Sequence, residues 1–340
     1  MSVHPFEAPH ADPELLGRPI KDLGLRLEGS PLEKYVVQLQ AELERKGLKH
    51  FRPRCYLTDE WGCPDQEPVI GIPFYLADPK LQALEREIND LEDEREIMMY
   101  LRHEAGHAFN YAYELYKRDD WKAVFGPFRR PYRDRYRPVP FSRRHVRHIA
   151  GWYAQKHPDE DFAETFAVWL TPRSNWRRRY KGWGALRKLR YVDRMARQCA
   201  NREPVRAMGE TDVTVDDMAV TLGEFYRQTM PDESQAIADL ALDTDLADIF
   251  VRKRGVRRNH VRPAADLLAE RRKDIVDKVT YWTGVRRPLV KKLVESIEDR
   301  VRHLKLATQH GREQAHVVEV TAYTTALAMN YLARGRFTQP

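Results

Sequence analysis

Residues 100–112 read YLRHEAGHAFNYA, a stretch in which two histidines stand four positions apart and a glutamate directly follows the first. Residues four apart on a helix project from one face, so His103 and His107 could bind the same metal ion. Glu104 would then lie beside the metal, where a carboxylate can act as a general base. The stretch predicts either a hydrolytic zinc site or a charged helix that carries the pattern by chance.

The residues around the two histidines favour a helix. Apolar side chains recur at helical spacing from Ile97 to Phe109, and no proline interrupts the run. Ala105, Gly106 and Ala108 are small, which leaves room for close packing beside a metal. Because a catalytic zinc ion has three protein ligands and one open position, the hypothesis requires a further ligand elsewhere in the chain.

Two glutamates in a later segment are candidates for the third ligand. One class of HExxH enzymes has a third histidine six positions after the second, but Tyr113 stands there, which excludes the metzincin arrangement. Residues 151–170, GWYAQKHPDEDFAETFAVWL, place Glu160 and Glu164 on one face of a predicted helix. One of them could bind the metal while the other accepts a hydrogen bond from the outer ring nitrogen of a ligand histidine. The spacing leaves open which is which.

Together these motifs resemble the catalytic core of gluzincin metallopeptidases, especially the anthrax lethal factor type and the bacterial zinc-binding metallopeptidase family. These families have HExxH on one helix and Glu-x-Phe-Ala-Glu on a later one, with a tyrosine seven residues before the first glutamate. The chain has the same features in the same order, at 103–107, at Tyr153 and at 160–164. The resemblance covers roughly residues 50–200.

The resemblance implies a zincin-like fold and a role for each matched position. Glu160 is expected to be the zinc ligand that joins His103 and His107. Glu164 is expected to hydrogen-bond a ligand histidine, although Glu164 as the direct ligand stays open. Tyr153 is expected to donate a hydrogen bond to the oxyanion of the tetrahedral intermediate.

The chain departs from lethal factor at two places. Asp161 stands where lethal factor has a phenylalanine, and the 52 residues between His107 and Glu160 form a longer connection. That connection is strongly basic, with nine Lys and Arg residues against one acid over 121–150. Residues 251–303 have 16 Lys and Arg against seven Asp and Glu. Both segments suggest an acidic partner, while nucleic acid is a weaker expectation because scattered cations usually lie on solvated faces.

The expected function is that of a zinc metallopeptidase, with Zn²⁺ as its cofactor and a peptide or protein as its substrate. A zinc-activated water would attack the peptide bond, and Glu104 would be the general base. The alternative is a non-catalytic binding protein that keeps the zincin fold and a structural zinc, and whose basic helical domain contacts nucleic acid or an acidic protein. The presence of Glu104 favours the enzyme, because a structural site does not need a base.

The pattern of apolar residues predicts an α+β fold in two domains. Residues 1–205 are expected to form a zincin-like metallopeptidase domain with a small sheet, and residues 206–340 an all-helical domain that could bind substrate or a partner. Strands are expected within 51–61 and 68–76, and a structured loop over 120–141. Helices are expected at 32–47, 79–116 with a break near Asn89 and Asp90, 158–170, 214–229, 233–250, 262–283, 287–306 and 313–333.

Composition limits the classes of protein to which the chain could belong. The net charge is +7, and no stretch is apolar over the length that a membrane span requires. The first residues lack the basic start and apolar run of a secretory signal. Three cysteines are too few for a disulfide framework. A cytoplasmic location is therefore expected.

Overall fold

The computed structural model describes residues 12–88, 91–133, 136, 138–229, 237, 240–252, 261–309, 311–334 and 337. Within these residues the chain is mostly helical with two small sheets, which is an α+β structure. The chain divides into two compact units, Met1–Thr229 and Met230–Pro340. The boundary expected after residue 205 lies inside the first unit, where Arg206 and the backbone of Glu210 hydrogen-bond to Glu67.

The first unit contains helices, short 3₁₀ turns and one pair of strands. Its helices are α1 (Pro13–Gly17), α2 (Glu33–Arg45), α3 (Pro79–Ile88), α4 (Glu94–Ala112), α5 (Asp119–Phe125), α6 (Pro158–Leu170), α7 (Trp176–Arg179), α8 (Ala185–Cys199) and α9 (Leu222–Thr229). The 3₁₀ turns are η1 (Ile20–Leu23), η2 (Phe74–Ala77), η3 (Leu115–Lys117), η4 (Tyr153–Gln155) and η5 (Val215–Asp217), and the strands are β1 (Arg54–Thr58) and β2 (Val69–Pro73).

Most predicted elements of this unit are confirmed, with corrections at their ends. The helices expected at 32–47 and 158–170 are α2 and α6. The helix expected over 79–116 is divided into α3 and α4, and Asn89 and Asp90 of the expected break lie outside the described residues. Of the helix expected at 214–229, α9 forms only the second half.

Helix α5 corrects the loop expected over 120–141. Asp119 and Asp120 lie in its first turn, where negative charge stabilises the helix N-terminus. Trp121 and Phe125, four residues apart, are buried, and the ring of Phe125 packs edge-on against that of Phe162 on α6. The prolines of the segment begin only after Phe125, so they break its second part and not its first.

The strands β1 and β2 run parallel, with Arg54 opposite Val69 and Thr58 opposite Pro73. Gly62, in the segment that joins them, exchanges backbone hydrogen bonds with Gly71 of β2 in an antiparallel bridge, with N···O distances of 3.3 and 2.7 Å. The connecting segment thus pairs with β2 as well, and after β2 the chain continues through η2 and α3 into α4.

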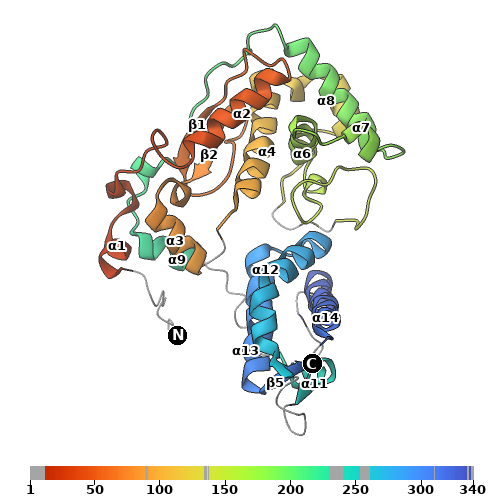
Figure 1. Ribbon diagram of the computed structural model, residues 1–340. Helices are drawn as coiled ribbons and strands as arrows, with labels where there is room; N and C mark the ends of the chain where they lie inside the picture. The colour runs from red at the N-terminus through yellow and green to blue at the C-terminus, as the bar shows by residue number, and fades with distance from the viewer. Residues whose placement is uncertain are drawn as a thin grey trace. The chain divides into compact units, whose positions relative to one another are not determined.

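Local signals define where α4 and α6 begin, and these two helices carry most of the candidate site residues. Asp93 and Glu96 form a capping box at the start of α4. In α6, Pro158 occupies the first turn, and the His157 ring nitrogen Nδ1 accepts a hydrogen bond from the backbone N–H of Asp159. Figure 1 shows α4 and α6 side by side in the first unit.

Gly106, inside the HEAGH sequence, packs directly against the backbone of α6. A Cβ atom at this position would lie 2.7 Å from the Cα and 2.9 Å from the carbonyl oxygen of Ala163. Both of these are backbone atoms of α6, so a larger residue at 106 would push the two helices apart. The absence of a side chain here therefore sets how closely the two motif helices pack.

Gly106→Ala is expected to lower the free energy of unfolding of the first unit by about 1–3 kcal/mol. This is the usual cost of overpacking a core, and it exceeds the gain of about 1 kcal/mol in helix propensity. Tryptophan fluorescence during urea unfolding measures the effect, because six of the seven tryptophans lie in this unit. Gly17→Ala is the control, since a Cβ there meets no atom within 4 Å. Equal stability of the Gly106→Ala protein and the wild type would contradict the prediction.

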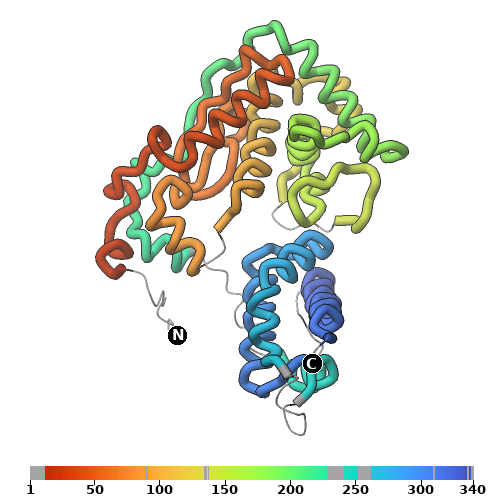
Figure 2. The backbone as a smooth tube through the Cα atoms, in the orientation of Figure 1, coloured from red at the N-terminus to blue at the C-terminus, as the bar shows by residue number. Residues whose placement is uncertain are grey.

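The second unit combines helices with a small sheet. Its described elements are α11 (Asp243–Ile249), β3 (Val251–Arg252), β4 (Val261–Pro263), α12 (Ala264–Thr283), α13 (Arg287–His303), β5 (Leu306–Gln309) and α14 (Glu313–Arg334). The backbone trace in Figure 2 shows α12 and α13 lying side by side. None of the described helices of either unit is both long and apolar enough to cross a membrane.

The prediction that this domain is all-helical is wrong. Its strands form an antiparallel sheet in the order β3-β5-β4. With two to four residues each, they are too short to show the alternation by which a strand is recognised in a sequence. The helices expected at 262–283, 287–306 and 313–333 are α12, α13 and α14, and most of the earlier part of the helix expected at 233–250 lies outside the described residues.

Candidate metal centre

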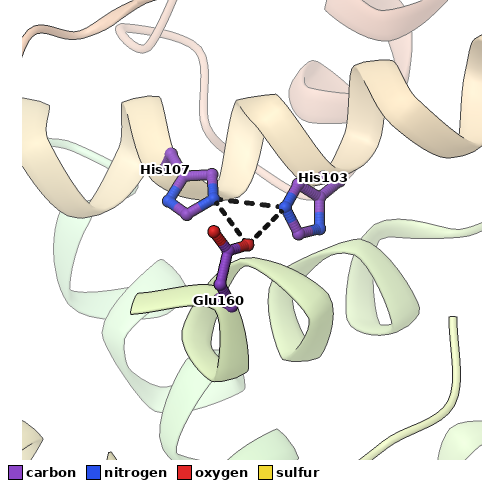
Figure 3. Close-up of side chains that lie close together, drawn as sticks. All are labelled: His103, His107 and Glu160. Carbon is purple, nitrogen blue, oxygen red and sulfur yellow. Dashed lines mark hydrogen bonds and ion pairs between the residues drawn. The ribbon is translucent and has the colours of Figure 1, made fainter. Parts of the chain in front are cut away.

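Helices α4 and α6 bring three predicted ligands together. The Nε2 atoms of His103 and His107 lie 3.2 Å apart, and Oε2 of Glu160 lies 3.0 Å from the first and 3.3 Å from the second. Figure 3 shows the two imidazoles on one helix facing the Glu160 carboxylate on the other. All three side chains are buried. Among the described residues, they are the one group of three or more His, Cys, Asp and Glu side chains whose ligand atoms all lie within 4.8 Å of one another.

The spacing and chemistry of these atoms fit a zinc ion. Two imidazole nitrogens and one carboxylate oxygen are the donors of a hydrolytic zinc site, which bind at about 2.0–2.2 Å. Tetrahedral ligands at that distance are about 3.3–3.6 Å apart, slightly more than the separations of 3.0, 3.2 and 3.3 Å between the three atoms. The group could therefore hold a metal ion without a large rearrangement.

The three side chains shift one another's protonation equilibria. Burial lowers the pKa of His103, but its contacts with Glu160 and Glu164 outweigh this and raise the pKa to about 9. Burial raises the pKa of Glu160, but His107 and His103 outweigh it and hold that pKa well below its usual range. The carboxylate is thus paired with protons on the imidazoles, and a divalent cation could take the place of those protons.

The Nδ1 atom of each imidazole contacts a further carboxylate, one that is not Glu160. Nδ1 of His103 lies 3.0 Å from Oε1 of Glu164, and Nδ1 of His107 lies 2.8 Å from Oδ2 of Asp159. Such contacts leave Nε2 free for a metal and fix the orientation of the ring. The backbone N–H of Ile149 donates to Oε2 of Glu164 at 3.0 Å. Glu164 therefore faces the outer nitrogen of His103, while Glu160 faces the inner nitrogens of both rings.

Asp159 is a residue of the site that the sequence analysis missed. Its Oδ1 accepts a hydrogen bond from Nδ2 of Asn110 at 2.7 Å, and its Oδ2 accepts one from the Tyr111 hydroxyl at 2.5 Å. Asn110 and Tyr111 follow His107 by three and four positions, so they lie on the same face of α4. That spacing was a readable signal for a polar partner on the facing helix.

The predicted Tyr153 lies beside the three ligand candidates. Its ring centroid is 5.7 Å from that of His103, and its hydroxyl oxygen is 3.4 Å from the hydroxyl oxygen of Tyr132. Burial raises the pKa of Tyr153, so the hydroxyl keeps its proton and can donate it in a hydrogen bond. Tyr132, which the sequence analysis did not single out, donates to Oε1 of Glu160 at 2.5 Å.

Glu104 is buried in the lining of the same cleft. Burial raises the pKa of its carboxyl group, and the nearby His103 and His107 act in the opposite direction. The cleft has a volume of about 1240 Å³, and His103, His107, Tyr153 and Glu160 also contribute to its lining. The six predicted site residues, Glu104, Tyr153, His103, His107, Glu160 and Glu164, thus gather in one region of the first unit.

Comparison with known proteins supports a metallopeptidase. Residues 65–224 match the family model described as "Putative zinc-binding metallo-peptidase". No curated protein and no solved structure matches the chain. The matched span is slightly less than half of the chain, and it contains the described cleft together with His103, His107 and Glu160. The family match and the buried His-His-Glu group together support a metallopeptidase.

Proposed function

We propose that the first unit is a zincin-like peptidase of the gluzincin type that hydrolyses peptide bonds with one zinc ion. The observation that carries the proposal is the convergence of three buried ligand atoms from His103, His107 and Glu160 beside the carboxylate of Glu104. A zinc ion held there would polarise the substrate carbonyl group and lower the pKa of water.

Glu104 is the proposed general base. Its carboxylate takes a proton from the attacking water and delivers it to the leaving amine. Burial raises its pKa from the ordinary value, which brings the carboxyl closer to the neutral range in which a base of this kind is most effective. Because Glu104 directly follows His103 on α4, the same helix orients the base and two of the ligands.

Tyr153 is proposed to stabilise the transition state. Its protonated hydroxyl would donate a hydrogen bond to the oxyanion that forms on the substrate carbonyl oxygen. Glu164 and Asp159 are proposed to act through the histidines, because they hold the imidazoles with Nε2 directed toward Glu160. The roles of Glu160 and Glu164 that the resemblance implies are therefore those that their contacts support best.

The alternative is a non-catalytic binding protein that uses the same residues for a structural zinc. Such a protein would need His103, His107 and Glu160 but not a carboxyl group at Glu104. Structural zinc sites have four protein ligands, whereas three converge here among the residues that the structure describes. The geometry therefore favours the peptidase.

Metal removal from the full-length protein tests the proposed function. The zinc-loaded protein is expected to hydrolyse fluorescein-labelled casein. Hydrolysis is expected to stop after a chelator removes the zinc, and to return when about one equivalent of zinc is restored. Mass spectrometry of the metal content reports the zinc bound per chain. Bound zinc without hydrolysis of casein or of a proteome-derived peptide library would favour the non-catalytic alternative. A chain that binds no zinc would contradict both.

A further inference from the structure

The cleft that is lined by His103, His107 and Glu160 is large, and six cations also line it. Its volume of about 1240 Å³ exceeds the roughly 300–1,000 Å³ of typical small-molecule pockets, so it has room for a peptide segment. Apart from Glu104, Asp159 and Glu160 near the histidines, the acids of its lining are Glu60 and Asp65. The cations of its lining are Lys117, Arg118, Lys122, Arg129, Arg130 and Lys156.

Four of these six cations form no ion pair with a carboxylate within the described residues. Lys117 forms an ion pair with Glu114 at 2.6 Å, and Arg118 forms one with Asp120 at 2.9 Å. Within the described part of the chain, no such ion pair is found for the other four cations, which are Lys122, Arg129, Arg130 and Lys156. Their charge is therefore available to a ligand in the cleft.

The segment that carries Arg129 and Arg130 is anchored next to Glu160, one of the three candidate ligands. The ring of Phe128 packs edge-on against that of His157, with centroids 6.2 Å apart. The carbonyl oxygen of Arg130 accepts a hydrogen bond from Nε2 of His157 at 2.8 Å, and two residues later the Tyr132 hydroxyl donates to Glu160. These contacts tie the chain on both sides of Arg129 and Arg130 to the start of α6.

Lys156 places a further positive charge close to the hydroxyl group of Tyr153. Its Nζ atom is 3.4 Å from the hydroxyl oxygen of Tyr153 and lies 4.3 Å from the ring centroid of Tyr132. Glu60 is near enough for Lys156 to lower the pKa of its carboxyl group, against the larger raising effect of burial. The described structure nevertheless contains no ion pair between the two, so a carboxylate of a ligand could still bind Lys156.

The described part of the basic segment 251–303 belongs to the second unit and contributes no residue to the lining of this cleft. Several of its arginines form ion pairs inside the second unit, with distances of 2.7 Å for two of them. These pairs are Arg262 with Glu270, Arg272 with Glu298, Arg287 with Asp277, and Arg300 with Asp243. Of the two basic segments, the one at 121–150 contributes cations to the lining of the cleft, namely Lys122, Arg129 and Arg130.

We propose that the cleft selects acidic peptide segments, whose Asp or Glu side chains near the scissile bond bind Lys122, Arg129, Arg130 and Lys156. The inference rests on the proposed peptidase function and names its substrate class. A cleft lined by charges of one sign concentrates ligands of the opposite sign and speeds their association. Nucleic acid is also anionic, but these cations line the same cleft as the His-His-Glu group, inside the span that matches a metallopeptidase family, which favours a peptide.

Peptide binding to the zinc-loaded Glu104→Gln protein tests this proposal without requiring hydrolysis. The probes are three pools of fluorescein-labelled ten-residue peptides that share a central pair of apolar residues. Around this pair the acidic pool carries Asp and Glu, the amide pool Asn and Gln, and the basic pool Lys and Arg. Fluorescence anisotropy is expected to show the acidic pool binding at least about tenfold more tightly than the amide pool, with an affinity that falls as salt is added. Equal affinity for the acidic and amide pools would overturn the proposal.

Charge reversal then locates the binding surface. Arg129→Glu combined with Arg130→Glu, in the same Glu104→Gln background, is expected to abolish the preference for the acidic pool while zinc content stays unchanged. Arg178→Glu combined with Lys181→Glu is the matched control, because both residues are exposed cations of the first unit outside the cleft. If the variant with Arg129 and Arg130 reversed kept its preference for the acidic pool while the control variant lost it, the acidic peptides would not bind in the cleft.

Two further outcomes separate this proposal from its rivals. A ten-nucleotide oligothymidylate that binds more tightly than the acidic pool, and that loses binding when Arg129 and Arg130 are reversed, would replace the peptide by nucleic acid. Tight and cleft-dependent binding of the acidic pool, together with no cleavage of that pool by the zinc-loaded protein that retains Glu104, would support the binding preference and contradict the peptidase function.

Discussion

Glu104→Gln is expected to reduce kcat/KM for peptide hydrolysis by about 10²–10⁴-fold, the usual contribution of a general base. The substitution keeps the size and shape of the side chain but removes its ability to take a proton from water. Glu104 does not converge with His103, His107 and Glu160 as a ligand, so zinc content is expected to remain at about one per chain. Initial rates on casein or on a peptide from a library screen, with zinc measured by mass spectrometry, give both quantities.

A matched control separates loss of the base from loss of a negative charge on the same helix. Glu94 also lies on α4, but it is exposed and pairs with Lys34, so Glu94→Gln is expected to leave the rate within about twofold of wild type. If Glu104→Gln hydrolysed peptides at the wild-type rate, the proposed mechanism would be wrong. If the variant lost its zinc instead, Glu104 would act in metal binding and not as a base.

Glu160→Ala is expected to abolish zinc binding, whereas Glu164→Ala and Asp159→Ala are expected to weaken it by about 10–100-fold. The first change removes the oxygen that faces both Nε2 atoms, while the others remove partners of the outer ring nitrogens. Competition with a chromophoric chelator measures the three affinities. Each variant removes one buried carboxylate near the same histidines, so each serves as a control for the effect of lost charge.

Unfolding experiments provide a second measurement of the same difference. Zinc that binds only the folded protein raises the free energy of unfolding by about 4 kcal/mol at a thousandfold excess over Kd. This increase is expected in wild type, a smaller one in Glu164→Ala and Asp159→Ala at the same zinc concentration, and none in Glu160→Ala. The opposite order, with zinc lost mainly in Glu164→Ala, would make Glu164 the direct ligand and exchange the roles of the two glutamates.

The predictions that the structure confirms depend on local physics. Helix α6 begins at Pro158 and ends at Leu170, as expected, because a proline in the first turn and acids beside it act on their own helix. The parts that needed correction depend on distant residues. The strands β3 to β5 form a sheet only because segments from three places meet, and α5 is helical because Trp121 and Phe125 are buried against other elements.

The sequence alone determined that His103 and His107 share a face of one helix and that Glu160 and Glu164 share a face of another, since helical spacing is a property of each segment. Only the tertiary structure decided which carboxylate meets which nitrogen. The close approach of α4 and α6 at Gly106 brings Glu160 to both Nε2 atoms. Glu164 and Asp159 instead contact the Nδ1 atoms of His103 and His107. That choice depends on how two helices pack across more than fifty residues of chain, and no local pattern specifies such packing.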